Sequence, residues 1–253
     1  MSRPVILEVA DGIARLTLAN AANRNAVDKA FVDALADATI ACEADASIRV
    51  IVMTAEGPVF SVGADLRAVL TAPGGPAAYV RYLAESFHES VLRLRAAAAP
   101  VVLGLNGMAA GGGFGLVCGA DLAVMARSAV LTSAYTASGL TPDAGTTWFT
   151  PRLTGRQRAF DILATNPRLD AEAALAAGLV ARVVDDDMLG DTLRQITAAL
   201  LAQPEGTPAA LKRLLAASEG SSLRDQLGRE TQSIAARMLQ PGVLARLQRF
   251  LKR

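Results

Sequence analysis

The sequence predicts an α/β fold followed by a wholly helical C-terminal part. Strand-like apolar runs alternate with helical segments from residue 5 to about residue 185, and this alternation is typical of right-handed βαβ-like crossovers. Beyond Asp187 only helical patterns follow, with breaks at Pro204, Pro208 and Pro241. With 253 residues, 52% of them hydrophobic, the chain can bury one large core. We therefore expect a core over residues 1–190 and a helical region over residues 191–253 that docks on the core or on another subunit.

The predicted elements begin with an antiparallel hairpin. Two strand-like runs, residues 5–10 and 13–18, are joined by Asp11-Gly12, a dipeptide that favours a tight type I′ turn. Asp28 is the expected N-cap of a helix with its apolar residues on one face. That helix leads into a buried strand over residues 49–54.

The remaining core elements follow at similar spacing. A helix over residues 77–98 precedes a buried strand over residues 101–105, and two short strands are expected over 121–126 and 130–133. The Pro/Gly-rich stretch over residues 72–76 predicts a mobile surface segment before that helix.

Composition excludes several classes of function. Twenty-five Lys and Arg against 24 Asp and Glu leave a net charge of +1, so no overall field attracts nucleic acid or an anionic membrane. Cys42, Cys118 and the single His88 lack the spacing of a metal site. The start has no secretory pattern, and the uncharged run over residues 96–120 is interrupted by proline and seven glycines, which argues against a membrane span. We expect a reduced, cytoplasmic protein without a metal.

The first candidate for chemistry is the glycine-rich turn after the strand at residues 101–105. Gly111, Gly112 and Gly113 let a ligand approach the main chain closely, and the N–H groups at a helix start suit a negative oxygen such as that of a developing oxyanion. Close packing of a helix on a strand is the plain alternative. A dinucleotide fingerprint with Gly115 and Gly119 is a rival, but no acidic residue lies between Leu122 and Pro142 to bind a ribose.

The second candidate is the small-residue turn Phe60–Leu66. Val62 and Ala64 can present N–H groups there, and Asp65 can cap the following helix, which is also its purely structural alternative. Two strand-to-helix turns in separate units can offer two convergent N–H donors, as an oxyanion hole requires.

The third candidate is Asp143. It follows Pro142 and precedes an apolar run that contains Trp148. A turn or an N-cap without chemistry is the alternative explanation.

Four motifs in this order resemble the crotonase family, which comprises enoyl-CoA hydratases and isomerases. They are Arg24-Asn25-Ala26, Phe60-Ser61-Val62-Gly63-Ala64-Asp65-Leu66, Asn106 to Gly113, and Gly139-Leu140-Thr141-Pro142-Asp143. The segment Ala174–Val184 is also similar, so the resemblance covers nearly the whole chain. It implies a ββα spiral core and a C-terminal helical oligomerisation region that packs between the subunits of a homotrimer or a dimer of trimers.

The resemblance also implies roles for individual residues. Val62 and Gly112 match the two backbone donors of the family's oxyanion hole. The substrate is implied to be an acyl-CoA thioester, with coenzyme A as part of the substrate and no permanently bound cofactor. The residues implied to line the bound CoA and acyl group are Arg24, Ala26, Ala64, Asp65, Leu66, Gly111, Gly115 and Tyr135.

One departure from the family pattern bears on the reaction. Family hydratases use two glutamates to activate water, and the matching positions here are Gly115 and Tyr135. Asp143 instead matches the carboxylate of a subgroup that includes the ring-1,2-epoxyphenylacetyl-CoA isomerases. The resemblance therefore implies an isomerase in which Asp143 is the acid/base.

Alternatives remain open at this point. Hydration, thioester hydrolysis or ring opening would use the same oxyanion hole, and a non-catalytic acyl-CoA binder or a dinucleotide-dependent oxidoreductase belongs to another class. Tyr135 is either a wall or an acid. His88 is expected on a helix surface or lid, and Phe87 and Trp148 are expected to shape the acyl site. The basic residues Arg246, Arg249, Lys252 and Arg253 are expected on a solvated face rather than on CoA.

Overall fold

The computed structural model describes residues 3–251. Strands β1 (Val5–Ala10) and β2 (Ile13–Leu18) form the predicted antiparallel hairpin. Its turn residues Asp11 and Gly12 have φ values of 53° and 76°, the pair of positive values that a type I′ turn requires.

Two sheets form the core. The larger has the order β1-β2-β3-β5-β7-β9, with β3 (Val50–Ala55), β5 (Val101–Leu105), β7 (Leu122–Ala126) and β9 (Arg182–Val184), and every pairing from β2 onward is parallel. The smaller has the order β4-β6-β8, with β4 (Val59–Ser61), β6 (Met108–Ala110) and β8 (Leu131–Thr132). Successive chain segments thus add one strand to each sheet, which is the expected ββα spiral.

Helices cover these sheets. Helix α1 (Lys29–Ala44) begins where the Asp28 carboxylate accepts the N–H of Phe31 at 2.8 Å, so the predicted N-cap is confirmed. Helix α3 (Pro76–Ala96) packs against α1, and the rings of Phe31 and Phe87 stack with centroids 6.4 Å apart. The other helices of the core are α2 (Leu66–Thr71), α4 (Gly112–Gly119), α5 (Thr146–Thr154), α6 (Arg156–Thr165) and α7 (Ala171–Ala177).

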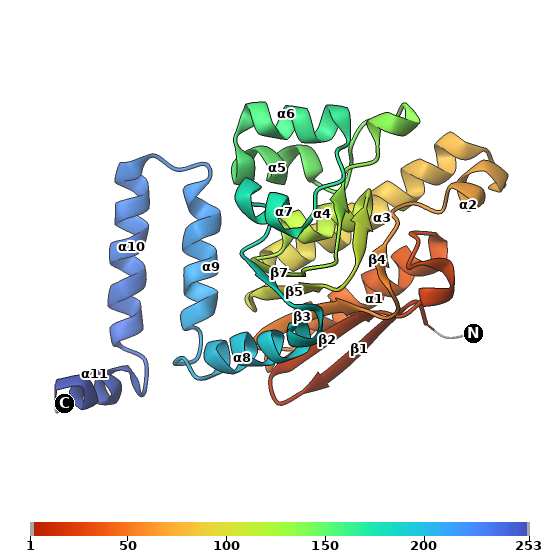
Figure 1. Cartoon of the computed structure of the whole chain (residues 1–253). Coiled ribbons are helices and arrows are strands. Elements are labelled where there is room, and N and C mark those ends of the chain that lie inside the picture. The colour runs from red at the N-terminus through yellow and green to blue at the C-terminus, as the bar shows by residue number, and fades with distance from the viewer. Residues whose placement is uncertain (1–2, 252–253) are drawn as a thin grey trace.

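The chain is helical after β9, as the sequence predicts, with four α-helices up to residue 251. Helix α8 (Leu189–Leu201) packs on the larger sheet, where Leu193 fills the space beside Gly104. Helices α9 (Thr207–Ser218), α10 (Leu223–Met238) and α11 (Val243–Leu251) extend away from the body, with α10 and α11 outermost (Figure 1). The expected division at residue 190 falls inside α8, and it stays a prediction.

The buried Lys212 of α9 pairs with Asp121 of the core. Lys212 Nζ lies 2.8 Å from Asp121 Oδ2 and also donates to the carbonyls of Leu94 and Ala99 at 2.8 and 3.1 Å. Burial lowers the pKa of the Lys212 ammonium, while the Asp121 charge opposes that change. Helix α9 is therefore attached to the core at a defined point.

Candidate active site

The candidate site is a cleft between α3, the start of α4 and the loop that carries Asp143. Five residues singled out from the sequence line it, namely Ala64, Phe87, Gly112, Tyr135 and Asp143. The rest of the lining is apolar and comes from the loop before α1 and from α3: Val27, Val80, Leu83 and Ala84. Tertiary folding thus brings residues from five separate segments together around one cleft with an apolar wall.

The two turns predicted to supply N–H donors contact each other at Gly63 and Gly111. A Cβ atom on Gly63 would lie 3.0 Å from the carbonyl oxygen of Ala110 and 3.1 Å from the Cα of Gly111. Gly63 and Gly111 also have positive φ values of 80° and 54°, a conformation that favours glycine. Both glycines are required for the turns to approach each other this closely.

The prediction that Val62 supplies an N–H to this cleft is wrong. The Val62 N–H donates to the carbonyl of Arg24 at 3.3 Å, and Val62 is not among the residues that line the cleft. Sequence spacing locates the turn, but it cannot tell which of its N–H groups faces outward.

Ala64, not Val62, lines the cleft, and the pairing of its neighbours gives the direction of its N–H group. Val27 and Ala64 form an isolated parallel bridge in which Val27 N–H donates to Gly63 O and Asp65 N–H donates to Val27 O. Because neighbouring N–H groups of an extended chain point in opposite directions, the Ala64 N–H points away from Val27. Gly112, the first residue of α4, likewise has an N–H without an acceptor inside the helix.

Asn25 stabilises the turn Phe60–Leu66 through hydrogen bonds, a role that the sequence does not predict. Its side chain is fully buried and donates to the carbonyls of Glu56 and Val59 at 3.1 and 2.9 Å, while its Oδ1 accepts the N–H of Asn20. Its own carbonyl accepts the hydroxyl of Ser61 at 2.8 Å. The sequence holds only a weak signal for this role, namely the residue type. The φ value of Asn25 is 51°, and asparagine is one of the few residues that tolerate such a value.

Tyr135 and Asp143 form a hydrogen-bonded pair at the other side of the cleft. The Tyr135 hydroxyl donates to a carboxylate oxygen of Asp143. Burial raises the pKa of the Tyr135 phenol far above its usual range, and the Asp143 charge adds to this effect. Tyr135 therefore stays protonated and acts as a donor that orients the Asp143 carboxylate.

His88 also belongs to this region, which corrects the expectation of a helix-surface or lid position. It is half-buried on α3, and its Nε2 accepts the backbone N–H of Ala144 at 3.0 Å. A lone histidine in the sequence carries no signal for this contact, because the partner is a backbone group 56 residues away.

The remaining predicted residues surround the cleft without lining it. Arg24 and Leu66 are exposed, whereas Ala26 is buried beneath the turn. Asp65 caps α2 by accepting the Ala68 N–H at 2.9 Å, a bond that lowers the pKa of its carboxyl. Gly111 caps α4, and Gly115 is buried in α4 beside Ala144.

One expectation about the surroundings changes. Phe87 lines the cleft as predicted, but Trp148 instead lies against the guanidinium of Arg152, 3.9 Å from the ring centre. Among the basic C-terminal residues, Arg246 donates to the carbonyl of Ala202 at 3.0 Å and Arg249 is exposed. Lys252 and Arg253 lie outside the described residues.

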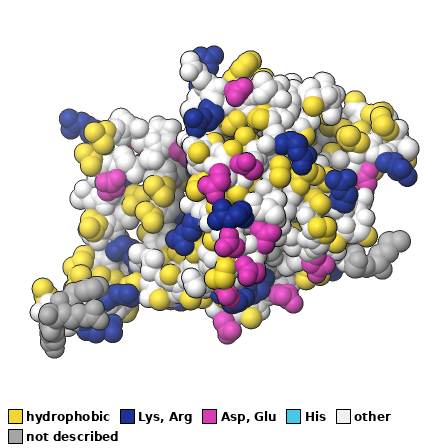
Figure 2. Space-filling model, in the orientation of Figure 1, with side chains coloured by type: hydrophobic (Ala, Val, Ile, Leu, Met, Phe, Trp, Pro, Cys, Tyr) yellow, Lys and Arg dark blue, Asp and Glu magenta, His cyan; other side chains and the backbone are white. Residues whose placement is uncertain are grey.

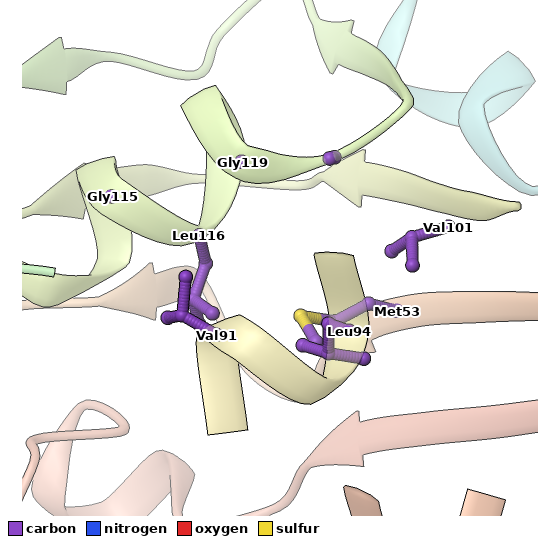
Figure 3. Close-up of a pocket in the computed structure, with 8 residues that line it drawn as sticks. Met53, Val91, Leu94, Val101, Gly115, Leu116 and Gly119 are labelled. Carbon is purple, nitrogen blue, oxygen red and sulfur yellow. The ribbon is translucent and has the colours of Figure 1, made fainter. Parts of the chain in front are cut away.

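A second, smaller hollow lies behind Gly115. It is lined by apolar side chains and glycines of α3, α4, β3 and β5, and Figure 3 shows Val91 and Leu116 on one side of it and Leu94, Met53 and Val101 on the other. Its volume of about 10 Å³ leaves room for about one water molecule. It is a packing gap rather than a substrate site.

Residues 3–251 show neither a metal-binding cluster nor a membrane-spanning helix. In that range, no three His, Cys, Asp or Glu side chains are grouped so that they could hold a metal ion. No helix of the same range is both long and apolar enough to cross a bilayer.

Comparison with known proteins places the chain in a family. Residues 8–250 match the family model described as enoyl-CoA hydratase/isomerase. The 1,2-epoxyphenylacetyl-CoA isomerase of Escherichia coli K12 is 34% identical over 236 residues, which cover 92% of this chain and 90% of that protein. A 4-chlorobenzoyl coenzyme A dehalogenase of an Arthrobacter species is 30% identical over 250 residues, covering 97% of this chain and 90% of that protein.

The fold agrees with this result. A crystal structure of an enoyl-CoA hydratase from Mycobacterium smegmatis superposes with a TM-score of 0.92 at 27% identity, covering 99% of this chain and 97% of that one. The predicted fold class is thereby confirmed. The protein belongs to the enoyl-CoA hydratase/isomerase, or crotonase, family and is an acyl-CoA-processing enzyme of that family.

Proposed function

We propose that the protein is an acyl-CoA isomerase that moves a double bond, or reorganises a ring, through an enolate. The observation that carries this proposal is the single carboxylate of the cleft, Asp143, held by Tyr135 opposite the start of α4. A double-bond shift needs one group that removes a proton and returns it elsewhere, and it needs no activated water. The glycine at position 115 and the tyrosine at position 135 leave the cleft without the two glutamates of family hydratases.

The thioester oxygen would bind the N–H groups of Ala64 and Gly112. Removal of an α proton by Asp143 gives an enolate whose negative charge builds up on that oxygen, and return of the proton at the γ carbon completes the shift. Backbone donors aimed at such a charge stabilise the transition state more than the ground state. Ala64 replaces Val62 in this role because the Val62 N–H is already bound to Arg24.

The coenzyme A portion is proposed to lie across the exposed rim formed by Arg24, Asp65 and Leu66. Arg24 offers a cationic guanidinium at the surface, which suits a phosphate. Asp65 contributes by capping α2 and so holding the rim. No resident cofactor is needed for this chemistry.

Assembly into a trimer or a dimer of trimers is part of the proposal. Helix α10 has no buried residue within the single chain. Figure 2 shows hydrophobic side chains on the outer surface of the α9–α11 region, and Leu227 and Ile234 are 53% and 68% exposed on α10. An exposed apolar face of this kind marks an interaction surface.

The decisive experiment compares the wild type with Asp143→Asn on a panel of 3-enoyl-CoA esters. The wild type is expected to convert them to the conjugated esters, and the variant is expected to bind them with unchanged affinity but without turnover. Isomerisation by Asp143→Asn at the wild-type rate would refute the role of Asp143. Efficient hydration of crotonyl-CoA by the wild type would refute the choice of isomerase.

Hydrolytic dehalogenation of an aromatic acyl-CoA is a second candidate. The similarity to dehalogenases over 97% of the chain favours it, as does a lone carboxylate that can attack an electron-poor carbon as well as remove a proton. Release of chloride from 4-chlorobenzoyl-CoA would support this reaction, and its absence together with double-bond migration would support the isomerase.

A further inference from the structure

The turn that follows Asp143 has an unusual backbone. Ala144 and Gly145 have φ values of 53° and 73°, and the N–H of Thr146 donates to the carbonyl of Asp143 at 2.9 Å. A left-handed conformation is ordinary for glycine, but it is unfavourable for alanine, whose Cβ comes too close to the following carbonyl oxygen. Contacts from outside the turn must hold Ala144 in this conformation.

Ala144 is fully buried, and its N–H points to His88. The Nε2 of His88 accepts this N–H at 3.0 Å. A buried N–H that loses its acceptor is destabilising, because it has given up its hydrogen bond to water and gained none in return. His88 therefore stabilises the strained residue directly after Asp143.

The contact also defines the tautomer of the neutral His88 imidazole. A backbone N–H only donates, so Nε2 must offer its lone pair, and the proton of the neutral ring is on Nδ1. His88 is fixed on α3, the same helix whose Leu83 and Phe87 form the apolar wall of the cleft. One rigid helix thus holds both the wall for the acyl group and the loop with the carboxylate.

We propose that His88 is a positioning residue for Asp143. By accepting the Ala144 N–H, it keeps the turn at 143–146 in the conformation that directs the Asp143 carboxylate to Tyr135 and into the cleft. This inference rests on the proposed function for its effect on rate, because it assigns Asp143 the proton transfer. The structural half, that His88 holds the turn, is independent of the reaction.

The test uses two variants of the full-length protein. His88→Leu removes the acceptor but keeps a similar volume, whereas His88→Gln retains an amide oxygen that can accept the same N–H. On 3-enoyl-CoA esters, His88→Leu is expected to lower kcat on the order of 10²-fold, the effect of misplacing a catalytic group by about 1 Å, with KM changed less than about twofold. His88→Gln is expected to recover most of kcat, and Glu85→Gln, an exposed change on α3, is the matched control.

Hydrogen exchange by mass spectrometry gives a readout that needs no activity. The peptide that contains Ala144 should exchange faster in His88→Leu and stay protected in His88→Gln. Unchanged kcat and unchanged protection in His88→Leu would overturn the proposal, and so would equal losses in both variants. If the wild type had no isomerase activity, the proposed function would fail, while the exchange of this peptide would still decide whether His88 holds the turn.

Discussion

Gly115 and Ala144 are packed so closely that neither position accepts a larger side chain. A Cβ atom on Gly115 would lie 2.5 Å from the Cβ of Ala144 and 2.9 Å from its carbonyl oxygen, which is closer than carbon atoms can approach without displacement. Position 115 is also where the family resemblance puts a hydratase glutamate. The turn that carries Asp143 therefore occupies the space that a side chain at position 115 would need.

Gly115→Ala and Gly115→Glu are expected to displace the Asp143 turn. Both variants should lose at least tenfold in kcat for isomerisation, since small misplacements of a catalytic group have effects of this order or larger, and Gly115→Glu should not gain hydration of crotonyl-CoA. Steady-state assays of both reactions provide the measurement. Gly190→Ala, at an exposed position on α8, is the control, and wild-type isomerisation by Gly115→Ala would contradict the steric argument.

Gly112→Pro removes one proposed oxyanion donor with little change to the backbone. Proline is favoured at the first position of a helix, and a Cβ here would lie 3.4 Å from Phe87, an ordinary contact. We expect kcat to fall on the order of 10² to 10³-fold. Gly112→Ala adds the same Cβ but keeps the N–H, so it should retain most of the activity; equal losses in both variants would show that crowding, not the donor, matters.

Asp65→Ala should lower the free energy of unfolding by about 1 kcal/mol, because it removes the N-cap of α2. Asp65→Asn keeps a capping oxygen and should cost less. The folded pKa of Asp65 lies below 3.8, so the protonation-linked stabilisation is present above pH 3.8 and is lost as the pH falls through the folded value. Urea unfolding between pH 7 and pH 3 should show a weaker acid dependence in Asp65→Asn; an unchanged pH dependence would contradict this.

Lys212→Met tests the attachment of α9. It removes the ammonium that pairs with the partly exposed Asp121 carboxylate and that donates to the carbonyls of Leu94 and Ala99. Leaving buried acceptors without their donor costs about 1–3 kcal/mol. The exposed pair of Lys29 and Asp33 is the comparison, because Asp33→Asn should cost less than about 1 kcal/mol. Urea unfolding measures the loss in the free energy of unfolding for Lys212→Met and Asp33→Asn. Equal losses would show that Lys212 contributes no more to stability than an exposed ion pair does.

Leu227→Glu combined with Ile234→Glu should dissociate the proposed assembly. Two carboxylates on the apolar face of α10 would have to lose their hydration in an interface. Light scattering coupled to gel filtration should report a lower mass than for the wild type. The double change to Met keeps the face apolar and should keep the mass; a monomeric wild type would contradict the proposed trimer.

Local sequence determined the course of the chain through most of the fold. Asp11-Gly12 predicts its turn because both residues tolerate positive φ, and Asp28 predicts the start of α1 because a side-chain oxygen satisfies a free N–H there. Strands β3, β5 and β7 are visible as apolar runs because they are buried on both faces. The short strands β4 and β6 are not visible in this way, since three residues are too few to show a period.

The sequence by itself determined only part of the candidate site. Gly112, Tyr135 and Asp143 stand in motifs whose residue types indicate their chemistry, and the sequence alone placed them together through a family resemblance. The choice of Ala64 over Val62 required the parallel bridge to Val27, because the direction of an N–H depends on its pairing partner. The roles of Asn25 and His88 depend on contacts with backbone groups far along the chain, and no local pattern encodes such a contact. The sequence thus determined the chemical groups of the site, and tertiary packing decided which of their atoms face the substrate.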